Sequence, residues 1–357
     1  MTDEIDIKQA IKTVVEGGVL DRDQAAGVMT RVMAGEVTGA QIGALITALR
    51  MRGETVDEIA GFAAAMRQYA LPVSVDLDDG PLVDTCGTGG DSAGTFNIST
   101  TAAFVIAGAG VRVAKHGNRA VTSKCGSADL LEGLGVAIEL PPAAVARCID
   151  EAGIGFMYAP AFHPAMRFVG PARREIGVRT VFNILGPLTN PAGARHQLIG
   201  VGHPDVAGKL AGALARLGNR HAVLVHAEEG LDELGLSGSS HVTEYDARDG
   251  EVRTYTISPD ELGLERARTE DLAGGELADN VSIAQAVLAG ERGPRRDVTV
   301  LNAGAGIYAA DAAASIAAGV VLAEAAIDSG RAAAALERLA ALSQELARDA
   351  AAAKVSA

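Results

Sequence analysis

The segment Leu82-Val-Asp-Thr-Cys-Gly-Thr-Gly-Gly-Asp91 decides the fold of this 357-residue chain, because a short apolar run leads directly into a loop of glycines. The apolar run predicts a buried strand, and the later Phe96-Asn-Ile-Ser-Thr100 is expected to open a helix. Glycines let backbone N–H groups turn toward an anion without a Cβ atom in the way. The strand, loop and helix N-terminus therefore predict an anion-binding corner. Its spacing matches neither a Walker loop nor a dinucleotide-binding loop.

Further short apolar runs alternate with helix-like stretches beyond this corner. They occupy residues 111–114, 156–158, 198–201 and 222–225. Continuous apolar strands separated by helices are typical of a largely parallel sheet with helices on both faces. Residues 242–257 instead predict an antiparallel ribbon whose turn is Asp249-Gly250. After Asp279 the chain is rich in alanine and is expected to be helical.

The first 72 residues predict helices only, since three N-cap patterns follow one another. The pairs are Asp21 with Gln24, Thr38 with Gln41, and Thr55 with Glu58. We therefore expect an α/β protein with a small all-helical N-terminal domain at residues 1–72. A larger α/β domain with a mainly parallel central sheet is expected at residues 73–357. The helical block carries no catalytic motif, so we expect a small domain without chemistry of its own. The alternative is that it forms a dimer interface.

The composition excludes several classes of partner. The chain has 31 Lys and Arg against 45 Asp and Glu, and this net charge of -14 disfavours non-specific binding to nucleic acid or membranes. Aromatic residues, at 3%, are too few for stacking platforms on single strands. The three cysteines have no CxxC spacing, so neither a zinc site nor a disulfide framework is expected. No apolar stretch suits a membrane span and the first residues are unlike a signal peptide, which predicts a cytoplasmic protein.

A second segment, Lys115-His-Gly-Asn-Arg-Ala-Val-Thr-Ser-Lys124, combines basic and hydroxyl side chains at the end of a predicted strand. No acidic residue lies between Asp91 and Asp129, whereas four basic residues do: Arg112, Lys115, Arg119 and Lys124. Glycine and hydroxyl groups beside positive charges favour a specific oxyanion site. A solvated loop is the alternative.

Two further motifs offer charged groups of opposite sign. Arg173-Arg174 falls on a predicted helix, where guanidinium groups can hold a carboxylate in a bidentate fork, although exposed arginines are often only solvated. Asp232-Glu233 follows the predicted strand at 222–225, and the carboxyl edge of a parallel sheet is where such folds bind ligands. Mg²⁺ favours one or two carboxylates together with substrate phosphates, so this pair is a candidate metal site.

These motifs, in this order, resemble those of the anthranilate phosphoribosyltransferase family. The similar segments are Gly87-Thr-Gly-Gly-Asp91, Asn97-Ile-Ser-Thr100, Lys115-His-Gly-Asn-Arg119, Arg173-Arg-Glu-Ile-Gly177, Asn183-Ile-Leu-Gly-Pro-Leu-Thr-Asn190, Gly230-Leu-Asp-Glu233 and Asn302-Ala-Gly-Ala305. The resemblance implies transfer of the phosphoribosyl group of PRPP to the amine of anthranilate, giving N-(5-phosphoribosyl)anthranilate and diphosphate, in tryptophan biosynthesis. It also implies a homodimer formed through the helical domain, which helices within about 163–180 would join.

The same resemblance assigns roles to individual residues. Those implied for PRPP are Gly87, Gly90, Asp91, Thr95, Asn97, Ile98, Ser99, Thr100, Lys115, His116, Gly117, Asn118, Arg119, Ala120, Val121, Thr122 and Ser123. Those implied for anthranilate are Gly87, Asn118 and Arg173, with Arg173 on the carboxylate. Ser99, Asp232 and Glu233 are implied ligands of Mg²⁺, with two ions per active site.

Two residues leave questions open within this resemblance. His116 is implied as the proton acceptor after the amine attacks, and a packing role for its ring is the alternative. Cys125 stands where a small hydroxyl residue or glycine is expected in many relatives, which predicts a loop sensitive to thiol reagents.

Two other functions remain as alternatives. Lys115-His-Gly-Asn118 also resembles related nucleoside phosphorylases, and a pyrimidine nucleoside phosphorylase would use free phosphate without a divalent metal. Asp232-Glu233 and the glycine loop argue against it. The alternative from a different class is a non-catalytic relative that binds nucleic acid. The negative charge, the few aromatics and the presence of Asn118 and Arg173 argue against that function.

Overall fold

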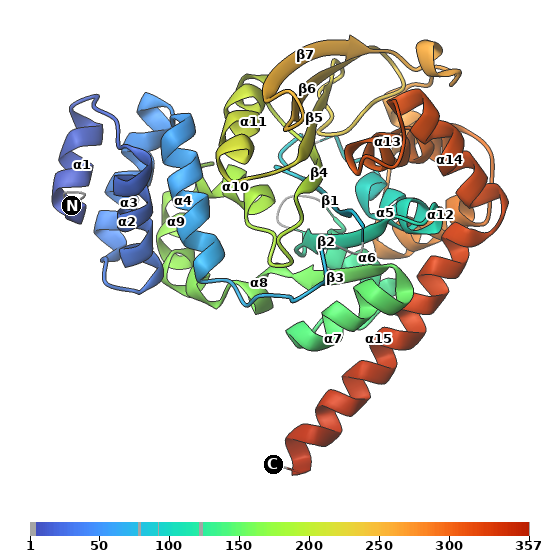
Figure 1. Ribbon diagram of the computed structural model, residues 1–357, viewed down its shortest axis with the longest axis horizontal. Coiled ribbons are helices and arrows are strands. Elements are labelled where there is room, and N and C mark those ends of the chain that lie inside the picture. The colour runs from blue at the N-terminus through green and yellow to red at the C-terminus, as the bar shows by residue number, and fades with distance from the viewer. Residues whose placement is uncertain (1–4, 78–79, 92, 121–123, 357) are drawn as a thin grey trace.

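The computed structural model describes residues 5–356 apart from 78–79, 92 and 121–123, with the side chains of 354–356 also left out (Figure 1). An N-terminal group of helices lies to one side of a central sheet, and the later helices flank the sheet. The long C-terminal helix α15 (Arg331–Ser356) runs outward from this body.

The N-terminal block consists of four helices: α1 (Ile7–Val15), α2 (Arg22–Met33), α3 (Gly39–Arg52) and α4 (Val56–Gln68). The predicted capping boxes at α2, α3 and α4 are confirmed, since each N-cap side chain accepts from the third helical N–H while that residue's side chain accepts in return. In α3, Ile42, Leu45, Ile46 and Leu49 are buried, the spacing of one helix face.

A later part of the chain returns to this block. The short helix α9 (Gly170–Ile176) contacts α3, and the 3₁₀ turn η2 (Pro164–Phe168) contacts α2. The Phe168 ring lies against Gly35, where a Cβ atom would come within 2.6 Å of it. Ala165, Val169 and Ala172 share a buried core with α1–α4, so residues distant in sequence complete this layer.

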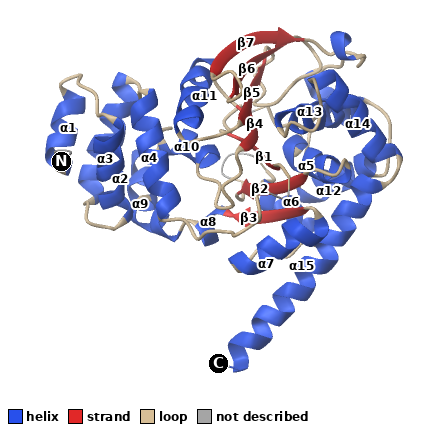
Figure 2. Cartoon of the chain, viewed as in Figure 1, coloured by secondary structure: helices blue, strands red, loops and turns tan. Residues whose placement is uncertain are grey.

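The sheet has seven strands in the order β3-β2-β1-β4-β5-β6-β7 (Figure 2). They are β1 (Leu82–Gly87), β2 (Arg112–Gly117), β3 (Ile154–Tyr158), β4 (His196–Gly200), β5 (His221–Ala227), β6 (Ser240–Asp246) and β7 (Glu251–Ile257). The first five pair in parallel, and β6 and β7 add an antiparallel ribbon at one edge. The predicted ribbon is therefore confirmed, with Asp249-Gly250 in its turn.

Helices cover both faces of the sheet because neighbouring strand residues point to opposite sides. In β4, Leu198 packs into the core formed with α5 and α13, whereas Ile199 packs into the core shared with α11 and the N-terminal helices. The remaining helices are α5 (Ile98–Gly108), α6 (Ser127–Gly133), α7 (Pro142–Arg147), α8 (Ala159–Phe162), α10 (Phe182–Leu185), α11 (Ala207–Arg216), α12 (Leu277–Leu288), α13 (Pro294–Ala309) and α14 (Ile316–Asp328).

The predicted fold class is confirmed: a small helical N-terminal part joins a larger α/β part with a mainly parallel sheet. Among the described residues, no helix combines the length and the apolar character that crossing a membrane requires.

Candidate active site

The topology places the candidate site where β1 and β4 lie side by side. The chain adds β2 and β3 on one side of β1, then crosses to add β4 and β5 on the other. Ligands of such sheets bind beyond the carboxyl ends of the strands, at the point where the order reverses. Gly87 ends β1 opposite Gly200, which ends β4, and the glycine loop starts there.

Backbone hydrogen bonds hold the glycine loop against the end of β4. Thr88 N–H donates to the carbonyl of Gly200 at 2.8 Å, and Gly202 N–H donates to the hydroxyl of Thr88 at 2.9 Å. On another side of the loop, Gly89 N–H donates to Oδ2 of Asp232 at 2.9 Å. The loop and the predicted acidic pair are therefore adjacent.

Asp91, Asp232 and Glu233 form an acidic group beside this loop. Burial, and then the charge of Asp91, raises the pKa of Asp232 to about 7. Burial, and then the charge of Asp232, raises the pKa of Glu233 to about 8. These carboxylates repel one another without a cation between them, and their hard oxygen atoms are the donors that Mg²⁺ prefers.

Ser99, in the first turn of α5, lies against the same acidic group. Its backbone N–H donates to Oε1 of Glu233 at 3.2 Å, and its hydroxyl group also hydrogen-bonds to that carboxylate. The three implied metal ligands, Ser99, Asp232 and Glu233, are therefore brought together from α5 and from the chain between β5 and β6. Carboxylates near a helix N-terminus are also stabilised by its exposed N–H groups.

Lys115 supplies a buried positive charge beneath the loop. Its side chain, with 2% of its surface exposed, donates from Nζ to the carbonyl of Thr85 at 2.6 Å. Burial lowers the pKa of Lys115, and the nearby carboxylates of Asp84 and Glu233 oppose that shift. Lys115 therefore partly compensates the buried acids, rather than projecting from the loop.

His116 is buried one residue further along β2. Burial, and then the ring of His163 at 4.9 Å between centroids, lowers the pKa of His116 to about 3. Within the described residues, its Nε2 atom has no hydrogen-bond partner. The ring is therefore neutral at physiological pH.

The basic residues of the predicted oxyanion segment form ion pairs with carboxylates of the same chain. Arg119 pairs with Asp129 at 2.9 Å and also with Glu132, so its guanidinium is already matched by carboxylates. Lys124 lies 2.6 Å from Glu276, and Arg112 lies 3.5 Å from Asp150. Carboxylates of α6, Asp150 and Glu276 therefore lie against the basic residues of this part of the chain, and the oxyanion site expected there stays a prediction.

The other residues implied for PRPP lie around the start of α5 and the end of β2. Asn97 donates from Nδ2 to the carbonyl of Cys125 at 3.1 Å, and its Oδ1 is buried without a partner among the described residues. Ile98 and Thr100 are buried, and Thr95 forms an isolated bridge with Ala273. Gly90 and Asn118 are exposed, whereas Gly117 and Ala120 are half-buried. Val121, Thr122 and Ser123 lie outside the described residues.

Arg173 stands in the last turn of α9 with its guanidinium 5.5 Å from the centre of the Phe182 ring. Burial lowers its pKa. No hydrogen bond or ion pair of this guanidinium occurs within the part of the chain that the structure describes. A half-buried guanidinium with unused donors suits a carboxylate that arrives with a substrate.

Two residues of this edge were missed by sequence reasoning. Asp84, in the middle of β1, accepts from Asn190 Nδ2 at 2.8 Å and from His116 N–H at 3.2 Å. Its position, a carboxylate in a buried strand before the glycine loop, was the available signal. Arg179 donates to the loop itself, and nothing in its local sequence indicates that contact.

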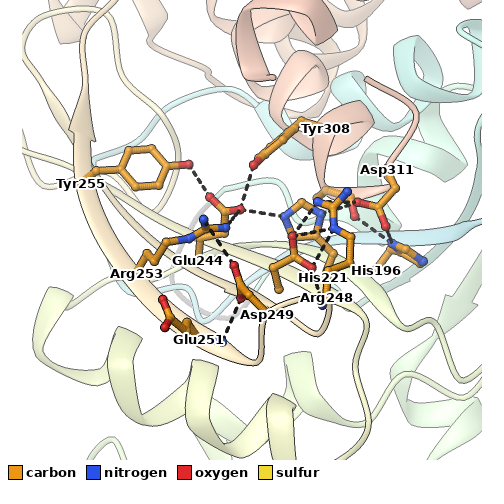
Figure 3. Close-up of polar contacts among 12 residues, drawn as sticks. His196, His221, Glu244, Arg248, Asp249, Glu251, Arg253, Tyr255, Tyr308 and Asp311 are labelled. Carbon is orange, nitrogen blue, oxygen red and sulfur yellow. Dashed lines mark hydrogen bonds and ion pairs between the residues drawn. The ribbon is translucent and has the colours of Figure 1, made fainter. Parts of the chain in front are cut away.

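A second polar cluster lies at the opposite, amino-terminal edge of the parallel strands (Figure 3). Among the described residues, His221, Glu244 and Asp246 bring potential metal-ligand atoms within 4.8 Å of one another. Both ring nitrogens of His221 are already engaged: Nδ1 lies 2.9 Å from Asp311, and Nε2 lies 3.1 Å from Glu244. A histidine held in this way has no free nitrogen for a metal ion.

Protein donors also occupy the carboxylates of this cluster. Tyr255 and Tyr308 donate to Glu244 at 2.7 and 2.8 Å, and Arg248 donates from Nε to Oδ1 and Oδ2 of Asp246 at 3.0 and 2.8 Å. The cluster ties β5, β6 and β7 to the end of α13, which is a structural role. A cavity of about 380 Å³ opens at this edge beside His196, away from the glycine loop.

Known proteins resemble the chain along nearly its whole length. The family described as "Glycosyl transferase family, helical bundle domain" matches residues 8–70, and "Glycosyl transferase family, a/b domain" matches residues 79–333. Anthranilate phosphoribosyltransferase of Chloroflexus aggregans is 58% identical over 341 residues, which cover 95% of this chain and 99% of that protein.

Solved structures agree with that similarity. Anthranilate phosphoribosyltransferase of Thermus thermophilus is 48% identical with a TM-score of 0.89, covering 94% of this chain and 99% of that one. The enzyme of Saccharomyces cerevisiae, solved in complex with PRPP and Mg, is 26% identical with a TM-score of 0.86, covering 95% and 98%.

Proposed function

The chain belongs to the anthranilate phosphoribosyltransferase family, and we propose from this premise how its residues serve that reaction. It transfers the phosphoribosyl group of PRPP to the amine of anthranilate, which releases diphosphate and gives N-(5-phosphoribosyl)anthranilate in tryptophan biosynthesis. The observation that carries the mechanism is that the glycine loop and the acidic group meet at one edge of the sheet, where Gly89 N–H donates to Asp232 and Ser99 N–H donates to Glu233.

The glycine loop and the start of α5 form the proposed PRPP site. Gly87, Gly90, Asp91, Thr95 and Asn97 to Thr100 would contact PRPP. The backbone N–H of Gly90 is the candidate donor to its phosphate oxygens, because the N–H groups of Thr88, Gly89 and Ser99 already donate within the protein. The residues from Lys115 to Ser123 complete this site in the proposal. Lys115 would act as a buried positive charge. It donates to the carbonyl of Thr85 and partly compensates the negative charge of the buried carboxylates.

The chain uses Mg²⁺, and we assign its ligands to Ser99, Asp232 and Glu233. The raised pKa values of both carboxylates support the assignment, because a cation would relieve the repulsion that causes them. Two ions per active site are proposed, since Asp91 adds a third carboxylate at this position. When bound, Mg²⁺ stabilises the negative charge that develops on the departing diphosphate.

Arg173, Asn118 and Gly87 form the proposed anthranilate site. The guanidinium of Arg173 would bind the carboxylate, and this contact positions the amine beside the ribose C1 atom. An aromatic amine is unprotonated at neutral pH, so attack needs no strong base. We keep His116 as the candidate proton acceptor after attack, although the pKa of His116, about 3 because of burial, supports a packing role.

The proposed domain division places residues 1–72 with the helices of about 163–180 in the helical domain, and the remainder of 73–357 in the α/β domain. The shared core of Val169 and Ala172 with α1–α4 supports it. We also propose a homodimer formed through the helical domain, supported by large apolar side chains exposed there: Val15, Val19, Met51 and Val178. A cytoplasmic location is proposed because the relatives of the chain are biosynthetic enzymes.

The loss of anthranilate fluorescence tests the activity directly. The signal should fall only when PRPP and Mg²⁺ are both present, and omission of either should abolish the change. Consumption of thymidine with free phosphate and without metal would instead show a nucleoside phosphorylase. A salt-dependent gel shift with single-stranded DNA would point to the nucleic-acid-binding alternative.

A further inference from the structure

Arg179 reaches from the segment after α9 to the glycine loop. Its Nη2 atom donates to the carbonyl oxygens of Thr88 at 3.0 Å and Gly89 at 2.9 Å. Gly90 has a φ of 91°, and a Cβ atom there would overlap the guanidinium. The loop therefore needs glycine at this position both for its backbone and for the space that Arg179 occupies.

Arg179 and Asp232 hold opposite sides of one peptide group. The C=O and N–H bonds of a trans peptide point in opposite directions. The carbonyl of Thr88 points at Arg179, and the N–H of the same peptide, on Gly89, points at Asp232. The carbonyl of Gly89 also points at Arg179, so Gly90 N–H is directed toward the other side. A loop N–H group that is turned away from the protein carbonyls can donate to an anion, and the N–H of Gly90 is the candidate here.

Arg179 belongs to the same short segment as Arg173. Arg173 is in the last turn of α9, Gly177 ends that helix with a φ of 68°, and Thr180 N–H donates to Asn183 Oδ1 at 2.9 Å where α10 begins. Only six positions along the chain separate the two arginines, so a displacement of this segment can reach both guanidinium groups.

We propose that Arg179 is a positioning residue that holds the carbonyls of Thr88 and Gly89 so that the N–H group of Gly90 faces the diphosphate of PRPP, while the N–H group of Gly89 stays bonded to Asp232, and that it couples the two substrate sites. The proposal rests on the proposed function. Arg179 acts through the loop carbonyls and does not touch the reacting atoms. Its planar guanidinium suits two neighbouring acceptors, whereas the compact ammonium of lysine suits them poorly.

The test compares Arg179→Gln and Arg179→Lys with wild type in the full chain. Arg112→Gln is the matched control, because Arg112 Nη2 also donates to two carbonyls, of Asp76 at 2.7 Å and Gly80 at 2.9 Å, at the amino end of β2. Calorimetry measures the PRPP Kd at saturating Mg²⁺, with and without benzoate as an unreactive carboxylate. Steady-state kinetics give the two KM values and kcat, and thermal melting checks folding.

We expect Arg179→Gln to raise the PRPP Kd and KM by about tenfold, the size of a lost charged hydrogen bond. Arg179→Lys should recover only part of this. Benzoate should tighten PRPP binding in wild type and lose that effect in Arg179→Gln. The Arg112→Gln control should bind PRPP as wild type does.

Four results would overturn the proposal. They are a PRPP Kd within about twofold of wild type in both Arg179 variants, full recovery by lysine, an equal change in the Arg112 control, or no effect of benzoate in wild type. Failure of the proposed function looks different. A wild-type protein that binds PRPP without consuming anthranilate would refute the reaction, and the PRPP Kd values would still decide the role of Arg179.

Discussion

Gly89 and Asp232, 143 positions apart in the sequence, are joined by a hydrogen bond of 2.9 Å from the backbone N–H to Oδ2. The bond links the loop proposed for PRPP to a carboxylate proposed for Mg²⁺. Because a carboxylate is acceptor-only when ionised and Asp232 has a pKa raised to about 7, proton loss or metal binding changes the charge that faces the loop. The loop and the metal site therefore form one unit.

The double change Asp232→Asn with Glu233→Gln should raise the Mg²⁺ concentration needed for half-maximal activity and raise the PRPP KM. Asparagine keeps an oxygen that can accept from Gly89 N–H, so the loop should keep its shape. The negative charge that would bind Mg²⁺ is lost. Titration of Mg²⁺ in the fluorescence assay measures this. Asp57→Asn is the control, because this carboxylate stands in the first turn of α4, is partly exposed and pairs with Arg216. An unchanged metal requirement would refute the ligand assignment.

Arg173→Ala should raise the anthranilate KM by about tenfold to a hundredfold and leave the PRPP KM close to that of wild type. The reason is the loss of a charged hydrogen-bonding pair, worth ~1.5–3 kcal/mol. Arg174→Ala, at the exposed neighbouring position, is the control. If the PRPP KM alone changed, the carboxylate role of Arg173 would be wrong.

The parts of the structure that the sequence predicted are those determined by residues close to one another in the chain. The capping boxes at α2–α4, the strand into the glycine loop and the ribbon with Asp249-Gly250 depend on residues within a few positions of one another. The partners of Arg119 and Lys124 come from α6 and from residue 276, and those of Arg179 come from about 90 positions away. Such contacts depend on the tertiary fold, so a count of charges along the sequence does not show which bases are paired.

Gly90→Ala should weaken PRPP binding more than Gly89→Ala. Both positions have positive φ, 91° and 64°, so each substitution carries a backbone cost of ~1–2 kcal/mol. Only at Gly90 does the added Cβ atom also meet Arg179, whereas at Gly89 nothing lies within 4 Å. Calorimetry of PRPP binding measures the difference. Equal losses at the two glycines would show that the guanidinium is not held there.

The His221 cluster should make stability depend on pH. Burial alone would lower the pKa of His221, but its bonds to Glu244 and Asp311 outweigh it, so the pKa is raised above 6.5. Burial raises the pKa of Glu244, but its hydrogen bonds with His221, Tyr255 and Tyr308 outweigh burial and lower the pKa to about 2. The histidine contribution is complete below 6.5 and is lost as pH rises through the raised pKa. The glutamate contribution is complete above 4.5 and is lost as pH falls toward 2.

His221→Gln should therefore lower the free energy of unfolding most between pH 4.5 and 6.5, and less at alkaline pH. Urea unfolding of wild type and variant at several pH values measures the difference. His203→Gln, at an exposed position, should show no such dependence. A His221 effect that stays constant or grows with rising pH would contradict the imidazolium bridge between the two carboxylates.

His116→Asn should lower kcat by less than about tenfold, because a neutral buried ring whose pKa is about 3 is a poor proton acceptor in the free enzyme. A true general base contributes ~10²–10⁴-fold, so the two roles differ in size. The profile of kcat/KM against pH reports ionisations of the free enzyme, and the wild-type and His116→Asn profiles should run parallel through about pH 6.5. His163→Asn tests the packing role from the other ring, 4.9 Å away, and should give a similarly small loss. A drop of about a hundredfold in kcat for His116→Asn alone, together with the disappearance of an ionisation step, would establish the proton-acceptor role instead.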